Sequence, residues 1–486
     1  MTMETRKKSL RLNAILNAIK QVCSILFPMI TFPFASRILG KASYGKINFS
    51  QSIISYILLI ASLGISNYAI REGAKIREDK RSLNQFANEV FTINLCSMLV
   101  SYLILFILIL FWKRLDGYGT LLLIQGLSIF FTTIGIDWVN SLYEDFTYIT
   151  LRYILCQSVA VVLMLLLVRS SDDYLIYALT SVSSTVLANI MNVGYIRRTY
   201  GLRIVPTYHP NFKKHIKPIM ILFGTSIASL IYINSDVTIL GILKNDSEVG
   251  LYSVSAKIYT LVKNLMNSML IVAIPRISNE IEKDDRNQIN SHLSDILSNL
   301  ILLIIPACIG LFMLSHNIIS LLSGVEYLEA TSSLQILSIS LIFASLACFF
   351  INVVMIPYRM ESNVLFATII SAIINIIFNI ILIPKWGQDA AALTTLASEI
   401  IMTVLGIYYT RHVCVFKLSK PILVDIINGL AVFTVCKTMI HFVSNDFFAI
   451  VLSVLLSLIL CFLILLIFYK DKIHNLFFKG IRKNKL

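Results

Sequence analysis

The chain has 486 residues, of which 57% are hydrophobic and 14% charged, and its mean hydropathy is +0.79. Soluble domains carry about a quarter charged residues, so water is not the main solvent of this chain. The formal net charge of +14 would suit nucleic acid, but the basic residues flank long apolar segments. That placement favours topogenesis and contact with anionic lipid headgroups over a nucleic-acid partner.

A membrane-spanning helix needs about 20 apolar residues to cross about 30 Å of hydrocarbon. Fourteen segments meet this requirement, so we expect an all-α polytopic membrane protein. The longest gap, 197–217, has 21 residues, which leaves no room for a water-facing catalytic domain. The predicted spans are 12–36, 47–70, 85–111, 120–139, 153–168, 174–196, 218–243, 250–274, 294–315, 332–356, 364–384, 388–410, 421–443 and 446–469. The fifth is the shortest, with Arg152 and Arg169 at its edges.

The basic residues predict the orientation of the chain. If the N-terminus is inside, 29 of the 41 Lys and Arg lie in cytoplasmic segments, 8 in external loops and 4 within spans. Cytoplasmic loops of membrane proteins carry such an excess, so we expect both termini in the cytoplasm. The largest clusters are Arg71–Arg81, Arg197–Lys217 and the tail from Lys470 to Lys485. Two acids near cytoplasmic span ends, Glu89 and Asp137, are predicted to lie at headgroup level.

Neither the cysteines nor the histidines form a recognisable reactive site. The eight cysteines are scattered, with none in an external loop, so no disulfide framework or metal spacing is expected. The seven histidines lie in loops or at span ends, which argues against a histidine relay at the midplane. No Ser-His-Asp, H-E-x-x-H or nucleotide-binding glycine motif is present. We expect a non-enzyme without catalytic residues, metal or cofactor, and no ATP hydrolysis by this chain.

A weak internal repeat divides the chain. Arg37-Ile-Leu-Gly40, Tyr44-Gly45 and Ala69-Ile-Arg-Glu72 recur as Thr238-Ile-Leu-Gly241, Val249-Gly250 and Ala273-Ile-Pro-Arg276, at an offset of about 201 to 205 residues. Two six-span halves in the same orientation are a plan found in transporters, with a site between them. The predicted parts are an N-terminal lobe (1–196), a basic linker (197–217), a C-terminal lobe (218–410) and an appended span pair with a basic tail (411–486).

Several motifs resemble those of Wzx-type polysaccharide exporters, which belong to the multidrug/oligosaccharidyl-lipid/polysaccharide exporter superfamily. The resemblance covers about 1–415. It is carried by Phe27-Pro28, Phe32-Pro33, Arg37-Ile-Leu-Gly40, Tyr44-Gly45, Asn234-x-Asp236, Gly241, Val249-Gly-Leu-Tyr252, Gly324-Val-Glu-Tyr327, Ala330, Asn375, Asn379, Pro384, Gly387, Ala390 to Ala392 and Glu399.

The resemblance implies two lobes around a central cavity that opens alternately to each face of the membrane. It also implies a cargo, an oligosaccharide repeat unit on undecaprenyl pyrophosphate, for capsule or O-antigen assembly in a bacterial cytoplasmic membrane. Besides this cargo and membrane lipid, the expected partners are a polysaccharide polymerase and a chain-length regulator.

Such a cargo needs cations for its phosphates and hydrogen-bonding groups for its sugars. Lys20, Lys257 and Lys263 lie inside predicted spans, where a charge is costly unless it faces water or a partner. Arg37 belongs to a basic cluster on the predicted external side and is a candidate late phosphate contact. Snorkelling or an ion pair is the structural alternative for these cations. The candidate substrate-binding residues are Lys20, Arg37, Lys257, Lys263, Asn375 and Asn379.

Asn375 and Asn379 share a helix face at i, i+4 spacing and could equally join two helices. Two carboxylates, Asp236 and Glu399, lie deep in predicted spans. They are candidates for an ion-coupling site (H⁺ or Na⁺) or a gate, together with Lys41. Asp236 could also pair with Lys257 or Arg37, and Lys263 with either acid.

Two alternative functions are open. A membrane-embedded polymerase or glycosyltransferase usually needs a large external loop, whereas the longest here, 316–331, has 16 residues. A cation-coupled multidrug exporter of the same superfamily would give no reason for lysines inside the membrane.

Overall fold

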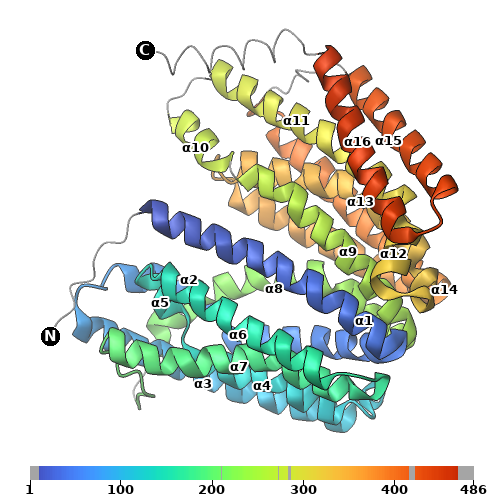
Figure 1. Ribbon diagram of the computed structural model, residues 1–486. Helices are drawn as coiled ribbons and strands as arrows, with labels where there is room; N and C mark the ends of the chain where they lie inside the picture. The colour runs from blue at the N-terminus through green and yellow to red at the C-terminus, as the bar shows by residue number, and fades with distance from the viewer. Residues whose placement is uncertain (1–9, 209–210, 272, 283–285, 415–421, 469–486) are drawn as a thin grey trace. The chain divides into compact units, whose positions relative to one another are not determined.

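The structure is a computed structural model that describes residues 10–208, 211–271, 273–282, 286–414 and 422–468. The basic tail from Lys470 to Lys485 lies outside the described residues. All regular elements of the described residues are helical (Figure 1). The α-helices are α1 (Leu10–Ser62), α2 (Ile65–Ala74), α3 (Lys80–Phe111), α4 (Gly119–Gly135), α5 (Trp138–Leu142), α6 (Phe146–Leu167), α7 (Tyr174–Thr199), α8 (Phe212–Leu243), α9 (Asp246–Ile271), α10 (Ile274–Glu282), α11 (Arg286–Met313), α12 (Ser315–Ser323), α13 (Thr331–Cys348), α14 (Glu361–Thr410), α15 (Ile422–Phe442) and α16 (Asp446–Phe468).

Eleven helical segments of the described residues are long and apolar enough to cross a membrane. Two of them are too long for one crossing, since the 53 residues of α1 would extend about 80 Å at 1.5 Å per residue. Both contain a non-helical glycine, Gly40 (φ 69°) in α1 and Gly387 (φ 54°) in α14. Dividing these two at their glycines and adding the shorter apolar helix Gly119–Gly135 brings the number to the predicted fourteen.

Several predicted span limits differ from the limits of the helices. The helix of the second predicted span is interrupted at Leu63 and Gly64, which adopt positive φ, and α2 follows as a separate helix within the same candidate span. The fourth ends at Gly135 instead of 139, where Ile136 adopts φ 49°. The fifth is not short. Arg152, taken as its edge, lies inside the 22-residue helix α6 and pairs with Asp137 at 2.5 Å.

Contacts divide the chain into two compact units, residues 1–250 and 251–486. In the first unit α8 packs against α1, α2 and α3. The lobe limits expected from the repeat place α8 in the second lobe, and they stay a prediction.

Each unit contains the same local arrangement at its predicted cytoplasmic end. In the first, the short helices α2 and α5 pack together over a core that includes Tyr68, Phe86 and Trp138. In the second, α10 packs against the π-helical turn η4 (Phe349–Met355) over a core that includes Phe349 and Leu293. The two pairs occupy equivalent places in the chain order, which supports the repeat. The pair α15 and α16 follows the second repeat and packs on α11 and α12.

An extended segment after α7 lies along α3 in the first unit. The backbone amides of Arg203, Val205 and Thr207 donate to side chains of α3 at 2.9 to 3.0 Å. Alternate residues of an extended chain repeat every 6.6 Å or so, and residues four apart on a helix are about 6 Å apart, so the two spacings match. The acceptors are accordingly spaced by four: Asn84, Asn88 and Thr92.

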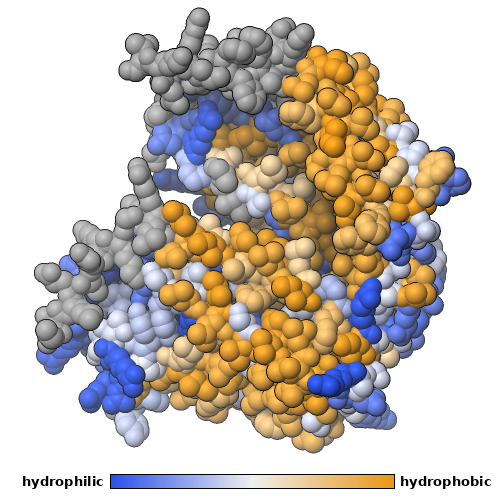
Figure 2. Space-filling view, in the orientation of Figure 1, coloured by the Kyte–Doolittle hydropathy of each residue, from blue (hydrophilic) through white to orange (hydrophobic). Residues whose placement is uncertain are grey.

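The helix surfaces fit a lipid environment. Large hydrophobic side chains are exposed on α6 and α16, for example Leu151, Leu155, Leu458 and Phe462. In Figure 2 hydrophobic residues cover broad faces of the helices, while hydrophilic residues gather toward helix ends. Because an exposed apolar face of this size would aggregate in water, the protein is a multi-pass membrane protein.

Candidate functional site

The most concentrated group of candidate residues lies inside the second unit, between α9 and α14. The ammonium of Lys263 donates to a carboxylate oxygen of Glu399 at 2.6 Å. The hydroxyl of Tyr259 donates to the same oxygen at 3.3 Å, and the Lys263 ammonium lies 5.5 Å from the centre of the Tyr259 ring. The Lys263 side chain is 24% exposed and that of Glu399 only 4%. The acid is thus enclosed, whereas the lysine remains open on one side.

Local sequence explains this geometry. Tyr259 and Lys263 are one helical turn apart on α9, so they present one face to Glu399. Glu399 lies on the part of α14 that follows the break at Gly387. Removal of one partner from a buried ion pair leaves an uncompensated charge, so the pair holds α9 and α14 together. The prediction that Lys263 pairs with Asp236 or Glu399 is thereby resolved in favour of Glu399.

Lys257 lies one and a half turns before Lys263 on α9 and is half-buried. Among the described residues of its unit it makes no ion pair and no side-chain hydrogen bond. A lysine in a membrane helix without a protein counter-ion is suited to an anionic ligand.

Asn375 and Asn379 lie in the first part of α14 and are 2% and 0% exposed. The amide of Asn379 donates to Asn375 at 2.9 Å, and the hydroxyl of Thr394 donates to Asn379 at 2.7 Å. Thr394 follows the break at Gly387, so its bond to Asn379 joins the two parts of α14. The geometry agrees with the interhelical alternative, and contact with cargo stays a prediction.

The candidates of the first unit are spread over its length. Lys20 is half-buried in α1 and makes no ion pair with a described residue. Arg37, exposed, and Lys41, half-buried, flank the break at Gly40. Asp236 is 5% exposed in α8.

A buried network that the sequence did not reveal joins α2, α3 and α8. The two ring nitrogens of His215 lie 2.6 Å from the Tyr68 hydroxyl and 2.7 Å from the Glu89 carboxylate. The side chain of His215 is 0% exposed and that of Glu89 is 12% exposed. These contacts bury the Glu89 carboxylate in the core of the unit, and its predicted headgroup level stays a prediction. In the sequence, the one sign of this network is that His215 and Glu89 both lie near the predicted cytoplasmic side of the membrane.

A second unpredicted cluster surrounds Asp246, at the predicted external end of the first unit. Its carboxylate accepts from Arg114 at 2.7 Å and from the hydroxyl of Tyr118. Arg114 also donates to the carbonyl of Gly241 at 2.8 Å. Burial, followed by the bond to Asp246, raises the pKa of Tyr118, so the phenol keeps its proton. Arg114 therefore fastens the turn between α8 and α9 to the loop before α4.

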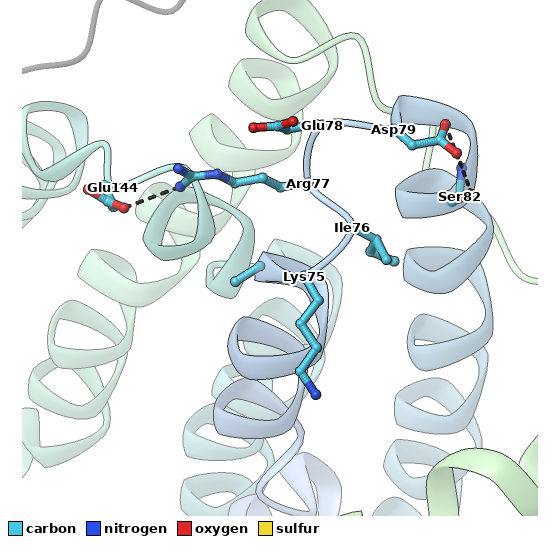
Figure 3. A pocket seen from close by; sticks show the side chains of 8 residues that line it. Lys75, Ile76, Arg77, Glu78, Asp79, Ser82 and Glu144 are labelled. Atoms are coloured by element: carbon cyan, nitrogen blue, oxygen red, sulfur yellow. Dashed lines mark hydrogen bonds and ion pairs between the residues drawn. The ribbon is translucent and has the colours of Figure 1, made fainter.

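A recess of about 720 Å³ at the opposite end is lined by the loop between α2 and α3 (Figure 3). Arg77 crosses it to Glu144 at 3.2 Å, and Lys75 pairs with Glu72 at 2.7 Å. Hydrogen bonds from Ser82 and the backbone hold the pKa of Asp79 below its usual value, where it caps α3. Because its charges are largely paired and hydrogen-bonded within the recess, we do not count it as a cargo site.

Comparisons with known proteins identify relatives over nearly the whole chain. A family model described as "Polysaccharide biosynthesis protein" matches residues 10–281. A putative O-antigen transporter of Escherichia coli K12 is 22% identical over 84% of this chain and 99% of its own length. The capsular polysaccharide biosynthesis protein CapF of Staphylococcus aureus is 22% identical over 82% of this chain and 98% of its own.

Among solved structures, the lipid II flippase MurJ in an inward closed conformation has a TM-score of 0.76. It is 19% identical, and the match covers 95% of this chain and 99% of that one. At this identity the match shows the fold alone, and it confirms the expected all-α polytopic fold class.

Proposed function

This chain belongs to the polysaccharide biosynthesis protein family, and from that premise we propose that it is a flippase for lipid-linked oligosaccharide units. It acts in a bacterial cytoplasmic membrane, with both termini inside, and supplies units for capsule or O-antigen assembly. The names of its relatives, a putative O-antigen transporter and a lipid II flippase, support transport of lipid-linked sugars. The finer cargo, undecaprenyl pyrophosphate carrying the sugars, is our proposal.

The observation that carries the cargo proposal is the pair of lysines on α9. Lys257 has no counter-ion among the described residues of its unit, and Lys263 keeps an open side while it pairs with Glu399. Ammonium groups are strong ligands for phosphate oxygens, and charge-assisted bonds are about twice as strong as neutral ones. In a multidrug exporter, the same lysines would repel cationic substrates and weaken their binding. We therefore assign the pyrophosphate contact to Lys257 and Lys263, and we propose Lys20 of the first unit as a cargo contact of its own.

Transport by this chain needs an energy source other than its own ATP hydrolysis, since it lacks a nucleotide-binding motif. We propose alternating access coupled to an ion, H⁺ or Na⁺, with the deep carboxylates Glu399 and Asp236 as candidate binding groups.

Deletion of the gene tests the function. We expect lipid-linked units to accumulate inside the cell and surface polysaccharide to be lost, because assembly outside lacks its precursor. Labelling of carrier-linked sugars on intact cells measures the units that have crossed. Units displayed outside at normal levels in the deletion strain would overturn the flippase function and favour a polymerase.

Variants of the same strain test the cargo contact. Lys257→Gln should abolish display of units outside while the protein still accumulates in the membrane. Lys437→Gln is the matched control, because Lys437 is an exposed lysine on α15 and should tolerate the change. Equal export by both variants would refute the role of Lys257.

A further inference from the structure

Lys263 and Glu399 differ in exposure, and this difference decides which of the two an anionic ligand can reach. One quarter of the Lys263 side chain is exposed, whereas Glu399 is enclosed and 4% exposed. A ligand phosphate can therefore reach the ammonium from its open side, while the carboxylate stays enclosed. The lysine carries three N–H donors, and Glu399 accepts from it through one oxygen.

Among the described residues of the second unit, no second cation pairs with Glu399. On α9, Tyr259 donates its hydroxyl to the carboxylate. On α13 and η4, the groups that face the pair are the thiol of Cys348 and the amide of Asn352, which donates to that thiol at 3.1 Å. On α14 itself, Thr403 lies one turn away and bonds backbone carbonyls. Within this part of the chain, Lys263 is the cation that pairs with Glu399.

We propose that Glu399 is the partner of Lys263 while no cargo is bound. When a cargo phosphate becomes the partner of Lys263, Glu399 takes up a proton. An ionised carboxylate that has lost its counter-ion in a membrane interior is strongly disfavoured, and a proton from water neutralises it. The neutral acid still accepts the hydroxyl of Tyr259. Each bound cargo thus adds one H⁺ to the protein, an inference that rests on the proposed function.

The sign of the pH dependence follows. Binding that takes up one proton strengthens about tenfold for each unit by which the pH falls, in the range where uptake is complete. The contact of Lys257 with phosphate involves no such carboxylate. Removal of the Lys257 ammonium should therefore weaken ligand binding without changing the number of protons taken up per ligand.

The test is calorimetric titration of the full-length protein in lipid nanodiscs with geranyl pyrophosphate, in two buffers of different ionisation enthalpy. Pyrophosphate itself titrates near neutral pH, so the informative quantity is the difference between wild type and variant. We expect the wild type to take up one proton more per bound ligand than Glu399→Gln. Lys257→Gln should bind more weakly with the wild-type proton number.

Glu399→Gln leaves Lys263 without its counter-charge and can fail to fold. The double variant Lys263→Gln/Glu399→Gln keeps this part of the interior neutral, and its proton uptake should equal that of the ligand alone. Equal uptake by wild type and the Glu399-lacking variants would overturn the proton switch and leave the flippase function standing. Absence of any binding of geranyl pyrophosphate by the wild type would overturn the pyrophosphate cargo and, with it, this inference.

Discussion

Gly45 and Gly250 make reciprocal contacts with each other's helix. A methyl group on Gly45 would overlap the carbonyl oxygen of Asp246, four residues before Gly250, and one on Gly250 would overlap that of Lys41, four residues before Gly45. The two glycines are 205 residues apart, which is the offset of the sequence repeat. All four residues lie in the first unit. The crossing is thus built from equivalent positions of the two repeats.

Gly45→Ala and Gly250→Ala should each destabilise the protein by about 1–3 kcal/mol, because a backbone carbonyl cannot yield to the new methyl group as a side chain could. Thermal unfolding of the purified protein measures this. Gly224→Ala is the matched control, since nothing lies within 4 Å of the added carbon in α8. The control should gain up to about 1 kcal/mol of helix propensity. A loss in Gly224→Ala equal to that in Gly45→Ala would contradict the close crossing.

Arg114→Ala should destabilise the first unit by about 1.5–3 kcal/mol, since it removes charge-assisted bonds to Asp246 and to the end of α8. Arg114→Lys should recover part of this loss, because the charge remains while the forked geometry is lost. Lys113→Ala, at the exposed neighbouring position, is the control and should change stability by less than about 0.5 kcal/mol. If Lys113→Ala destabilised the protein as much as Arg114→Ala, the stabilisation would not be specific to the bonds of Arg114.

Tyr68→Phe should destabilise the protein by about 1–3 kcal/mol, because the buried Nδ1 of His215 loses its hydrogen bond. The matched control is Tyr208→Phe, where the side chain is 98% exposed and stability should be unchanged. Chemical or thermal unfolding in detergent measures both. Unchanged stability of Tyr68→Phe would show that the hydrogen bond between Tyr68 and His215 contributes no net free energy to folding.

Reporter fusions test the orientation predicted from the basic residues. A reporter that is active only outside the cytoplasm should be active when fused after Lys113 and inactive when fused after Lys213. The reverse pattern should hold for a cytoplasm-only reporter at the same two positions. Activity of that second reporter after Lys113 would invert the topology, since Lys113 lies between the third and fourth spans.

Two of the breaks in the helices could be predicted from the sequence, and two could not. Hydropathy separated the spans on either side of Gly40 and of Gly387, although each pair forms one nearly continuous run of helix. The bilayer imposes this, since no single helix of about 50 residues fits its thickness. Hydropathy did not predict the breaks at Leu63 and Ile136, which lie in apolar stretches and depend on the packing of α2 against α5.

The sequence by itself determined that the chain spans a membrane about fourteen times and that it repeats, and it predicts the depth of each lysine and acid. Only the tertiary structure decided that Lys263 meets Glu399, 136 residues away, and that Glu89 meets His215 in a buried core. The reason is geometric. Apolar length fixes the position of a residue along the membrane normal, whereas the rotation of each helix and the identity of its neighbours are set by packing between segments that are distant in the chain.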